Sequence, residues 1–337
     1  MKKIACLIFV VALAFVQNAH AKDDYFDNAG RADAWQGGVR MIPITTPRGS
    51  FRVWTKRTGN NPKLKVLLLH GGPALTHEYF EVMDSYLPAA GVEYYYYDQL
   101  GSAYSDQPTD TTLWEIPRFV DEVEQVRKAL GLDEKNFVLM GHSWGGMLAM
   151  EYALAHPEHL KGLVISSMMS SIPAYNRYAH DVLMPKMPPD VLKQILAFEE
   201  AKDYENPKYM ELLFPTWYTE HFLRRPFDQW PEPVMRSIAH MNRAIYVPMQ
   251  GPSEMSASGR LVNWDRSQDL GKIKVPTLVI GAGHDTMDPK HMEWMAKQFP
   301  HGRFVLCPEG GHMAFYDDPE PYFKGLLAFL KDVEGKP

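Results

Sequence analysis

Short apolar runs, separated by turn residues, recur along the chain and alternate with helical stretches. The runs cover residues 64–69, 92–97, 137–140, 162–165, 276–280 and 304–306. Runs of this length with apolar residues at consecutive positions are typical of strands that are buried on both faces. An earlier pair, residues 39–45 and 51–57, flanks Pro47-Arg48-Gly49-Ser50 and predicts a hairpin.

The clearest helical pattern covers residues 116–130, where apolar residues recur at spacings of three and four and Gly131 follows the last of them. A second helical stretch, MLAMEYALAH, begins at Met147. Strands that alternate with amphipathic helices predict an α/β fold, in which a mostly parallel sheet has helices on both faces. Ligands bind such sheets at the carboxyl ends of the strands, so we expect the functional residues in the loops there.

This alternation is interrupted between residues 169 and 263. The stretch holds 11 of the 26 prolines, so long regular helices are not expected in it. Its aromatic residues either pack the insertion or line a cavity: Tyr175, Tyr178, Tyr209, Phe214, Trp217, Tyr218, Phe222 and Trp230. We therefore predict a helical cap, residues 169–263, inserted into a core that consists of residues 38–168 and 264–337.

The first 21 residues have the parts of a secretory signal peptide. Two lysines precede an apolar run at 4–16, and Ala19-His20-Ala21 forms an A-x-A cleavage pattern. As a helix, the apolar run would be about 20 Å long, shorter than the roughly 30 Å hydrocarbon core of a bilayer. We expect export to the periplasm or the medium, no stable membrane anchor after cleavage, and a loose mature terminus at 22–37.

Charge and cysteine content exclude several classes of function. The chain has 337 residues, of which 45% are hydrophobic, and removal of residues 1–21 leaves 33 basic and 41 acidic residues. Nucleic acid is therefore not an expected partner. Cleavage also removes Cys6, so that Cys307 cannot form an intramolecular disulfide. The histidines lack the H-E-x-x-H spacing, and we expect neither a metal nor a cofactor.

The most specific motif is Gly141-His142-Ser143-Trp144-Gly145-Gly146, which lies between a predicted strand and a predicted helix. G-x-S-x-G in this context is typical of a nucleophile elbow, a strained turn that presents a serine hydroxyl at the start of a helix. We predict that Ser143 is a nucleophile. The backbone amide of Trp144 is then the first donor of an oxyanion hole.

A serine nucleophile needs a general base, and the base needs an acid to orient it. Asp285 and His312 each follow a predicted strand, and the order Ser143, Asp285, His312 is the order found in hydrolases with this type of sheet. We predict these two as the acid and the base. Other residues near the motifs could take the same roles: Asp288 for the acid, and His70, His142 and His284 for the base.

Acyl transfer also needs a second oxyanion donor, and removal of one such donor lowers the rate by about a hundredfold to a thousandfold. The loop His70-Gly71-Gly72-Pro73 follows the strand predicted at 64–69, where hydrolases of this kind place that donor. Gly72 is our first candidate and Gly71 our second.

Taken together, these motifs resemble the proline iminopeptidase (prolyl aminopeptidase) branch of the α/β-hydrolases, including the tricorn-interacting aminopeptidase. The likeness runs from about Gly38 to the carboxyl end. HGGPG occurs at 70–74 and D-Q-x-G-x-G-x-S at 98–105, each with one alanine, Ala74 or Ala103, in place of a glycine. The resemblance implies an α/β-hydrolase fold and the release of amino-terminal residues, proline among them, from short peptides. An alanine where the backbone needs a positive φ would narrow the pocket or alter its loop.

The resemblance also implies a site for the free amine of the substrate. Residues 204–207 and 251–254 resemble cap motifs of that branch, which makes Glu254 and Glu211 the candidates. A peptide amine has a pKa of about 7.7 to 8.0, so it arrives largely as an ammonium ion that must be paired when it is buried. Two alternatives use the same fold: an amidase or carboxylesterase with the same triad, and a binding protein without catalysis.

Overall fold

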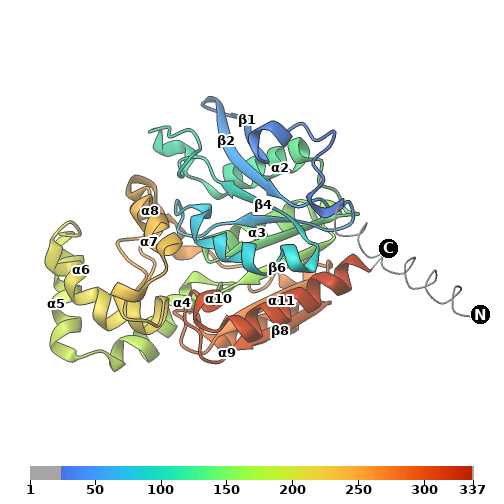
Figure 1. Cartoon of the computed structure of the whole chain (residues 1–337). Coiled ribbons are helices and arrows are strands. Elements are labelled where there is room, and N and C mark those ends of the chain that lie inside the picture. Colours follow the sequence, from blue (N-terminus) through green and yellow to red (C-terminus); the bar gives the residue numbers. More distant parts are fainter. Residues whose placement is uncertain (1–23, 336–337) are drawn as a thin grey trace, which may run out of the picture.

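The computed structural model describes residues 24–335, and the predicted signal peptide lies outside the described residues. Within that part, the central sheet has eight strands in the order β1-β2-β4-β3-β5-β6-β7-β8 (Figure 1). Strands β3 to β8 run parallel, whereas β2 pairs antiparallel with both β1 and β4. The strands are β1 (Val39–Thr46), β2 (Gly49–Thr58), β3 (Lys65–Leu69), β4 (Glu93–Asp98), β5 (Phe137–His142), β6 (Gly162–Ser166), β7 (Thr277–Ala282) and β8 (Gly302–Cys307).

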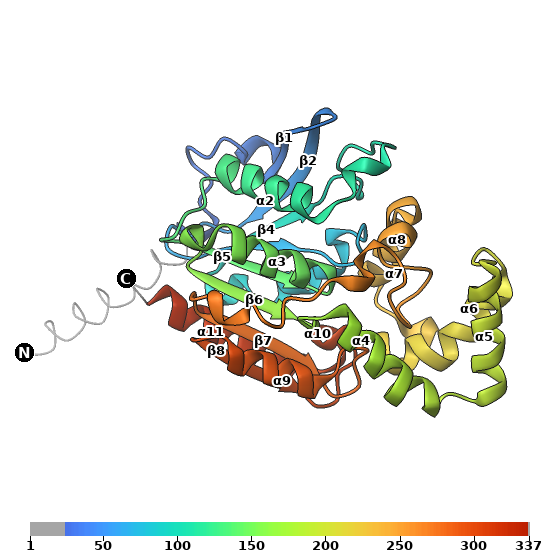
Figure 2. The same cartoon turned by 180° about the vertical axis from the view of Figure 1, so that it is seen from behind.

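Helices cover both faces of the sheet, as the views in Figures 1 and 2 show. Those of the core are α2 (Ile116–Leu130), α3 (Trp144–Ala155), α9 (Pro289–Gln298), α10 (Ala314–Asp317), α11 (Pro319–Glu334) and the 3-10 helix η3 (His77–Ser85). Those between β6 and β7 include α4 (Ile172–Tyr178), α5 (Pro189–Ala201), α6 (Pro207–Leu213), the π-helix η9 (Phe214–Phe222), α7 (Glu232–Ala239) and α8 (Arg243–Met249). None of the helices in residues 24–335 combines the length and the apolar character that a membrane crossing needs.

Two hydrophobic layers hold these helices against the sheet, because successive strand residues point to opposite faces. Leu67 and Leu69 pack with residues of α2, α3 and α9. Val66 and Leu68 pack with residues of η3 and α11 on the other face. The prediction of an α/β fold with a mostly parallel, doubly covered sheet is thus confirmed.

The predicted local elements agree closely with the structure, with one exception in the sheet. Helix α2 has the bounds that the sequence predicts, and Gly131 ends it in the left-handed conformation. β8 is the exception, because it lies at the edge of the sheet and most of its residues are partly exposed. Its short apolar sequence resembles a central strand, since the apolar pattern does not record which strand lies at the edge.

Residues 24–37 are held more firmly than their polar sequence predicts. Asp33 forms a bidentate ion pair with Arg57 of β2, at 2.9 and 2.8 Å, and both side chains are buried. Tyr25 donates a hydrogen bond to the carbonyl oxygen of Val92. The described part of the segment predicted to be loose, residues 24–37, is therefore held in place, and the reason is a set of contacts to distant strands that the absence of periodicity did not reveal.

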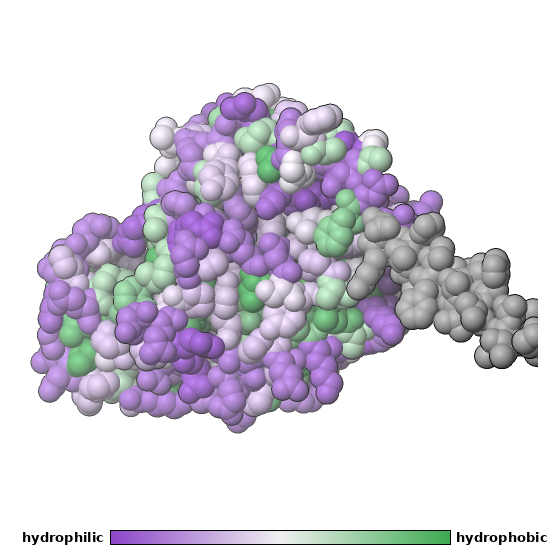
Figure 3. All heavy atoms as spheres, in the orientation of Figure 1, coloured by the Kyte–Doolittle hydropathy of each residue, from purple (hydrophilic) through white to green (hydrophobic). Residues whose placement is uncertain are grey.

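The segment between β6 and β7 forms the helical cap at one end of the molecule (Figure 2). Its two ends lie side by side, since the amide of Ile172 donates to the carbonyl oxygen of Trp264 and Ser171 bridges to Asp265. The cap has its own hydrophobic cluster around Trp217, Tyr209 and Ile195. The face shown in Figure 3 is largely hydrophilic, with apolar side chains in small groups.

Candidate active site

Ser143 occupies a sharp turn between β5 and α3. It is a non-glycine residue with φ 56° and ψ −128°, a strained conformation of the kind that functional sites retain. The turn needs glycine on both sides: a Cβ on Gly141 would lie 1.9 Å from the Gly145 carbonyl oxygen, and one on Gly145 would lie 2.0 Å from that of Leu69. The two glycines therefore allow the close turn that presents the serine at the carboxyl end of β5.

His312 and Asp285 form a buried pair at the same end of the sheet. His312 Nδ1 lies 2.7 Å from Asp285 Oδ1, and each residue is at most 1% exposed. The carbonyl oxygen of His312 also lies 2.9 Å from Nε2 of His142, the residue before Ser143. The structure thus brings the histidine loop against the nucleophile elbow. Asp288, the alternative acid, instead accepts a hydrogen bond from the Lys290 amide at the start of α9.

Each member of the pair shifts the pKa of the other in the direction that favours a charged aspartate beside a basic histidine. Burial alone would lower the pKa of His312, but the charge and hydrogen bond of Asp285, together with the charge of Glu254, raise it. Burial alone would raise the pKa of Asp285, but the charge and hydrogen bond of His312 and the Met287 amide lower it. Asp285 therefore stays ionised and bonds His312 through Nδ1, which is the pairing that a general base in such a triad needs.

The other three histidines that the sequence analysis considered have different surroundings. Burial lowers the pKa of His70 to about 4 and that of His142 to about 3, so both are neutral near pH 7. His70 Nε2 accepts a hydrogen bond from the Gln99 amide. The carbonyl oxygen of His284 lies 2.8 Å from Nδ1 of His221 in the cap. Among the described residues, only His312 is paired with Asp285.

The two predicted oxyanion donors lie beside the serine. Gly72, Ser143 and Trp144 line one small cavity together. Trp144 is the first residue of α3, where a backbone amide has no partner within the helix. The amide of Gly71, the second candidate, is already used, because it donates to the hydroxyl of Tyr79 at 2.6 Å.

Gln99 joins the two loops that carry these donors. Its Oε1 accepts from the Trp144 indole at 2.8 Å, and its Nε2 donates to the carbonyl oxygen of His70 at 3.0 Å. All three residues are buried. The glutamine of the D-Q-x-G-x-G-x-S sequence thus acts as a clamp between elbow and loop.

Ala74 and Ala103 both occupy backbone conformations that glycine favours. Their φ angles are 62° and 33°. An L-residue in the left-handed region is strained by about 1 to 2 kcal/mol relative to ordinary conformations. The carbonyl oxygen of Ala74 accepts a hydrogen bond from Asn242 at the start of α8, so this strained residue also contacts the cap.

Glu254 is the buried acidic residue on the cap side of the site. It is 7% exposed and lines two cavities. The smaller cavity also contains Ser143, and the larger one is lined by Tyr218, Phe222 and other mostly apolar residues. Burial raises the pKa of Glu254, against the opposing charge of His312 and a 2.6 Å hydrogen bond from the Tyr246 hydroxyl.

The structure does not bring Glu211 to this site. Its side chain is 62% exposed on α6, pairs with Lys208 at 3.3 Å and lines neither cavity. The physical reason is helix geometry: Tyr209 and Leu213 form the buried face of α6, and a residue two positions from each lies on the opposite face. The spacing of the cap motif alone does not specify which face is buried.

Several cap residues at the site were anticipated only as a group of aromatics. Tyr175 donates to the carbonyl oxygen of Glu254 at 2.6 Å, and the Trp217 indole does so at 3.2 Å. The ring of Phe222 stacks on that of His312, with 5.6 Å between centroids. Tyr246 was missed because no motif contains it and its contact with Glu254 depends on how the cap folds.

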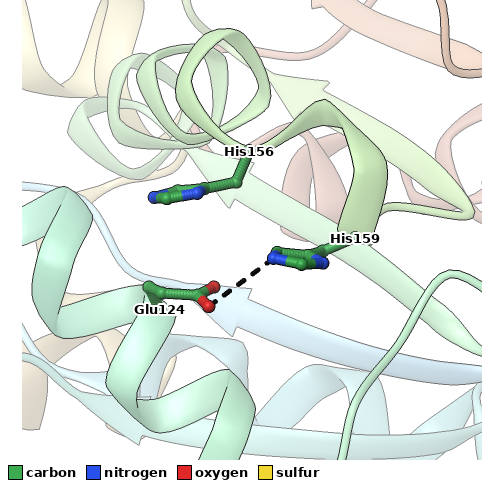
Figure 4. A group of neighbouring side chains, drawn as sticks. All are labelled: Glu124, His156 and His159. Carbon is green, nitrogen blue, oxygen red and sulfur yellow. Dashed lines mark ion pairs between the residues drawn. The ribbon is translucent and has the colours of Figure 1, made fainter.

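One group of possible metal ligands occurs within residues 24–335: Glu124, His156 and His159 (Figure 4). Glu124 is already bonded to Arg127 at 2.8 Å and paired with Lys128 at 3.1 Å. Two neighbouring cations oppose the binding of a divalent ion. Burial would raise the pKa of Glu124, but these bonds lower it to about 2, as expected for an ion-pair cluster.

Comparison with known proteins gives concordant similarities. The family model of the alpha/beta hydrolase fold matches residues 65–319. The proline iminopeptidase of Elizabethkingia meningoseptica is 55% identical over 298 residues, which cover 88% of this chain and 99% of the relative. That of Flavobacterium johnsoniae is 54% identical over 293 residues, covering 87% and 98%. The crystal structure of proline iminopeptidase from Mycobacterium smegmatis superposes with a TM-score of 0.78 at 27% identity, covering 88% and 98%.

Proposed function

The chain belongs to the proline iminopeptidase family of α/β-hydrolases and is a serine-type hydrolase that acts on peptides, and from this premise we propose that it is an exported aminopeptidase. It releases amino-terminal residues, proline among them, from short peptides through an acyl-enzyme. The observation that carries the proposal is the position of Glu254, a buried carboxylate in the cavity that contains Ser143.

The core supplies the acyl-transfer chemistry. Ser143 Oγ attacks the carbonyl carbon of the first peptide bond, and His312 takes the proton of the Ser143 hydroxyl. The amides of Trp144 and Gly72 stabilise the oxyanion that forms. His312 then gives the proton to the leaving amine, and water repeats the sequence on the acyl-enzyme. Asp285 holds the imidazole and stabilises its charged form.

The cap supplies the selection of the substrate. A buried ammonium group needs an anionic partner, and Glu254 offers one in a cavity of mostly apolar residues. Pairing with the ammonium also favours the ionised form of Glu254, against the burial that raises its pKa. An amine held there places the first peptide bond over Ser143, so the enzyme acts one residue at a time. Glu211 has no part in this proposal because it is exposed.

Export rests on the residues before the described part of the chain. The two lysines, the apolar run and the A-x-A sequence at residues 1–21 support a signal peptide. Cell fractionation and amino-terminal sequencing test it, and the mature protein is expected to begin at Lys22 outside the cytoplasm. A full-length protein in the cytoplasm would refute export without affecting the activity. The resemblance to the tricorn-interacting aminopeptidase stays a prediction.

The decisive experiment compares free-amine and amine-blocked substrates. We expect hydrolysis of prolyl and alanyl anilides, loss of that hydrolysis when the amine is acylated, and loss of all activity in Ser143→Ala. Glu254→Gln is expected to lower kcat/KM for the free-amine anilides by about a hundredfold, because an ion pair in a buried site is lost. It should leave hydrolysis of a nitrophenyl ester nearly unchanged.

Glu211→Gln is the matched control, since it removes the same charge from the exposed face of α6. Its kinetics should equal those of the wild type. Equal turnover of blocked and free-amine anilides, or an ester as the one substrate cleaved, would instead favour the alternative of an amidase or carboxylesterase.

A further inference from the structure

A chain of hydrogen bonds joins the three loops of the proposed active site through Tyr79 and His142, two residues without a role in the mechanism above. Tyr79 is the third residue of η3, the helix that follows the loop with Gly72. Its hydroxyl accepts from the Gly71 amide at 2.6 Å and lies 3.1 Å from His142 Nδ1. His142 Nε2 in turn lies 2.9 Å from the carbonyl oxygen of His312.

The partners determine the direction of every bond in this chain. A carbonyl oxygen can only accept, so His142 Nε2 carries the hydrogen and donates to His312. In the neutral imidazole Nδ1 then accepts, and the Tyr79 hydroxyl is the donor to it. The tyrosine oxygen accepts from Gly71, as an amide requires. Burial lowers the pKa of His142 to about 3, so the ring is in this neutral form near pH 7.

We propose that Tyr79 and His142 are positioning residues that set the spacing between the oxyanion loop, the nucleophile elbow and the His312 loop. The inference rests on the proposed acyl-transfer function. Tyr79, His142 and His312 are at most 1% exposed, so water cannot replace the bonds between them. By occupying the Gly71 amide, Tyr79 also leaves Gly72, which lines the same cavity as Ser143, as the remaining candidate donor of this loop.

Close packing makes the spacing of these loops critical. A Cβ on Gly71 would lie 2.9 Å from Ser143 Cβ and 3.3 Å from the Tyr79 hydroxyl, so the loop lies directly against the nucleophile. Oxyanion donors must be held within about 0.5 Å of their productive positions. Misplacement by about 1 Å can lower the rate by about a hundredfold. Loss of the Tyr79 hydroxyl is therefore expected to affect the chemical step more than substrate binding.

The test is Tyr79→Phe, with Tyr96→Phe as the matched control. Tyr96 is equally buried, and its hydroxyl bonds to Asp84 and Phe80, neither of which belongs to the three loops. Active sites are counted with a fluorophosphonate, so that kcat refers to folded enzyme. We expect Tyr79→Phe to lower kcat by tenfold to a hundredfold with KM within about twofold. The affinity for a small trifluoromethyl ketone, which forms an oxyanion on the serine, should fall by a similar factor. Tyr96→Phe should change neither quantity.

A second pair of variants separates positioning from packing at residue 142. His142→Gln keeps one donor and one acceptor, whereas His142→Leu removes both at similar volume. We expect Gln to recover at least tenfold in kcat relative to Leu. The proposal would be overturned if Tyr79→Phe kept the wild-type kcat, or if it lowered only the number of active sites that the fluorophosphonate labels. Equal kcat values for His142→Gln and His142→Leu would also overturn it.

Using both a nitrophenyl ester and a prolyl anilide distinguishes this inference from the proposed function. If the wild type cleaves the ester and not the free-amine anilide, the aminopeptidase proposal fails. The positioning roles of Tyr79 and His142 would still be tested on the ester, because ester hydrolysis needs the same oxyanion donors.

Discussion

The core loops and the cap of this protein are built in different ways. Ser143, Asp285 and His312 each follow a parallel strand. The register of the sheet therefore places all three at the carboxyl ends of the strands. Glu254 lies in an irregular stretch of the cap and reaches the site through contacts with Tyr175, Trp217 and Tyr246. The proposed chemistry thus depends on regular structure, whereas the proposed substrate selection depends on side-chain packing, and the two regions should respond differently to substitution.

The largest loss of activity is expected from a substitution in the loops of the core. Asp285→Asn should lower kcat about a thousandfold to ten-thousandfold, because the imidazole loses the partner that orients it and stabilises its charge. The loss should be equal for esters and for free-amine anilides, in contrast to Glu254→Gln. Asp288→Asn is the control, because the Asp288 side chain bonds to the first turn of α9, and this variant should retain activity. Equal losses in both variants would contradict the assignment of Asp285.

The junction between the two regions provides the next test. Arg236 of the cap helix α7 pairs with Glu78 and Glu81 of η3, at 3.3 and 2.7 Å, and Glu78 is fully buried. Arg236→Ala leaves a buried carboxylate with fewer partners, so we expect unfolding free energy to fall by about 2 to 3 kcal/mol in urea titrations. Arg243→Ala, whose partner Glu205 is exposed, should cost less than about 1 kcal/mol. Similar losses would mean that Arg236 does not link cap and core.

A smaller effect should reveal the electrostatic link between cap and catalytic base. The charge of Glu254 favours the protonated form of His312 and contributes to its raised pKa. In Glu254→Gln this contribution is lost, so His312 remains neutral, and active as a base, to lower pH. We expect the acid limb of the kcat/KM profile for a nitrophenyl ester to move to lower pH. Glu211→Gln should leave the profile in place, and an unmoved limb in Glu254→Gln would disprove the link.

The smallest expected effect concerns Ala74, where core and cap meet. Ala74→Gly removes the strain of a left-handed alanine, which should stabilise the folded state by about 1 to 2 kcal/mol. Glycine also gives the unfolded chain more conformational freedom, which should lower the stability by about 0.4 to 1 kcal/mol. We therefore expect a slight stabilisation, measured by thermal unfolding. Ala129→Gly, within α2, should instead destabilise by about 1 kcal/mol. A clear loss in Ala74→Gly would show that its methyl group packs favourably.

Much of the fold and of the catalytic loops could be predicted from the sequence, because these features depend on residues that are close together along the chain. The glycines around Ser143 identify a turn that excludes larger residues, and the spacing within residues 116–130 defines α2 to its ends. The predictions were wrong where a distant partner decided the outcome. Arg57 anchors the polar amino terminus through Asp33, and the position of β8 at the sheet edge exposes an apolar sequence.

The sequence by itself determined the α/β architecture and the order of the serine, the aspartate and the histidine along it. Strand and helix periods, turn glycines and strand-end positions are properties of neighbouring residues. Only the tertiary structure decided that Glu254 is buried and Glu211 exposed, and that Tyr79 and His142 join three loops. Those outcomes depend on which faces of separate elements meet, and a buried hydrogen bond across up to 170 positions leaves no period in the chain.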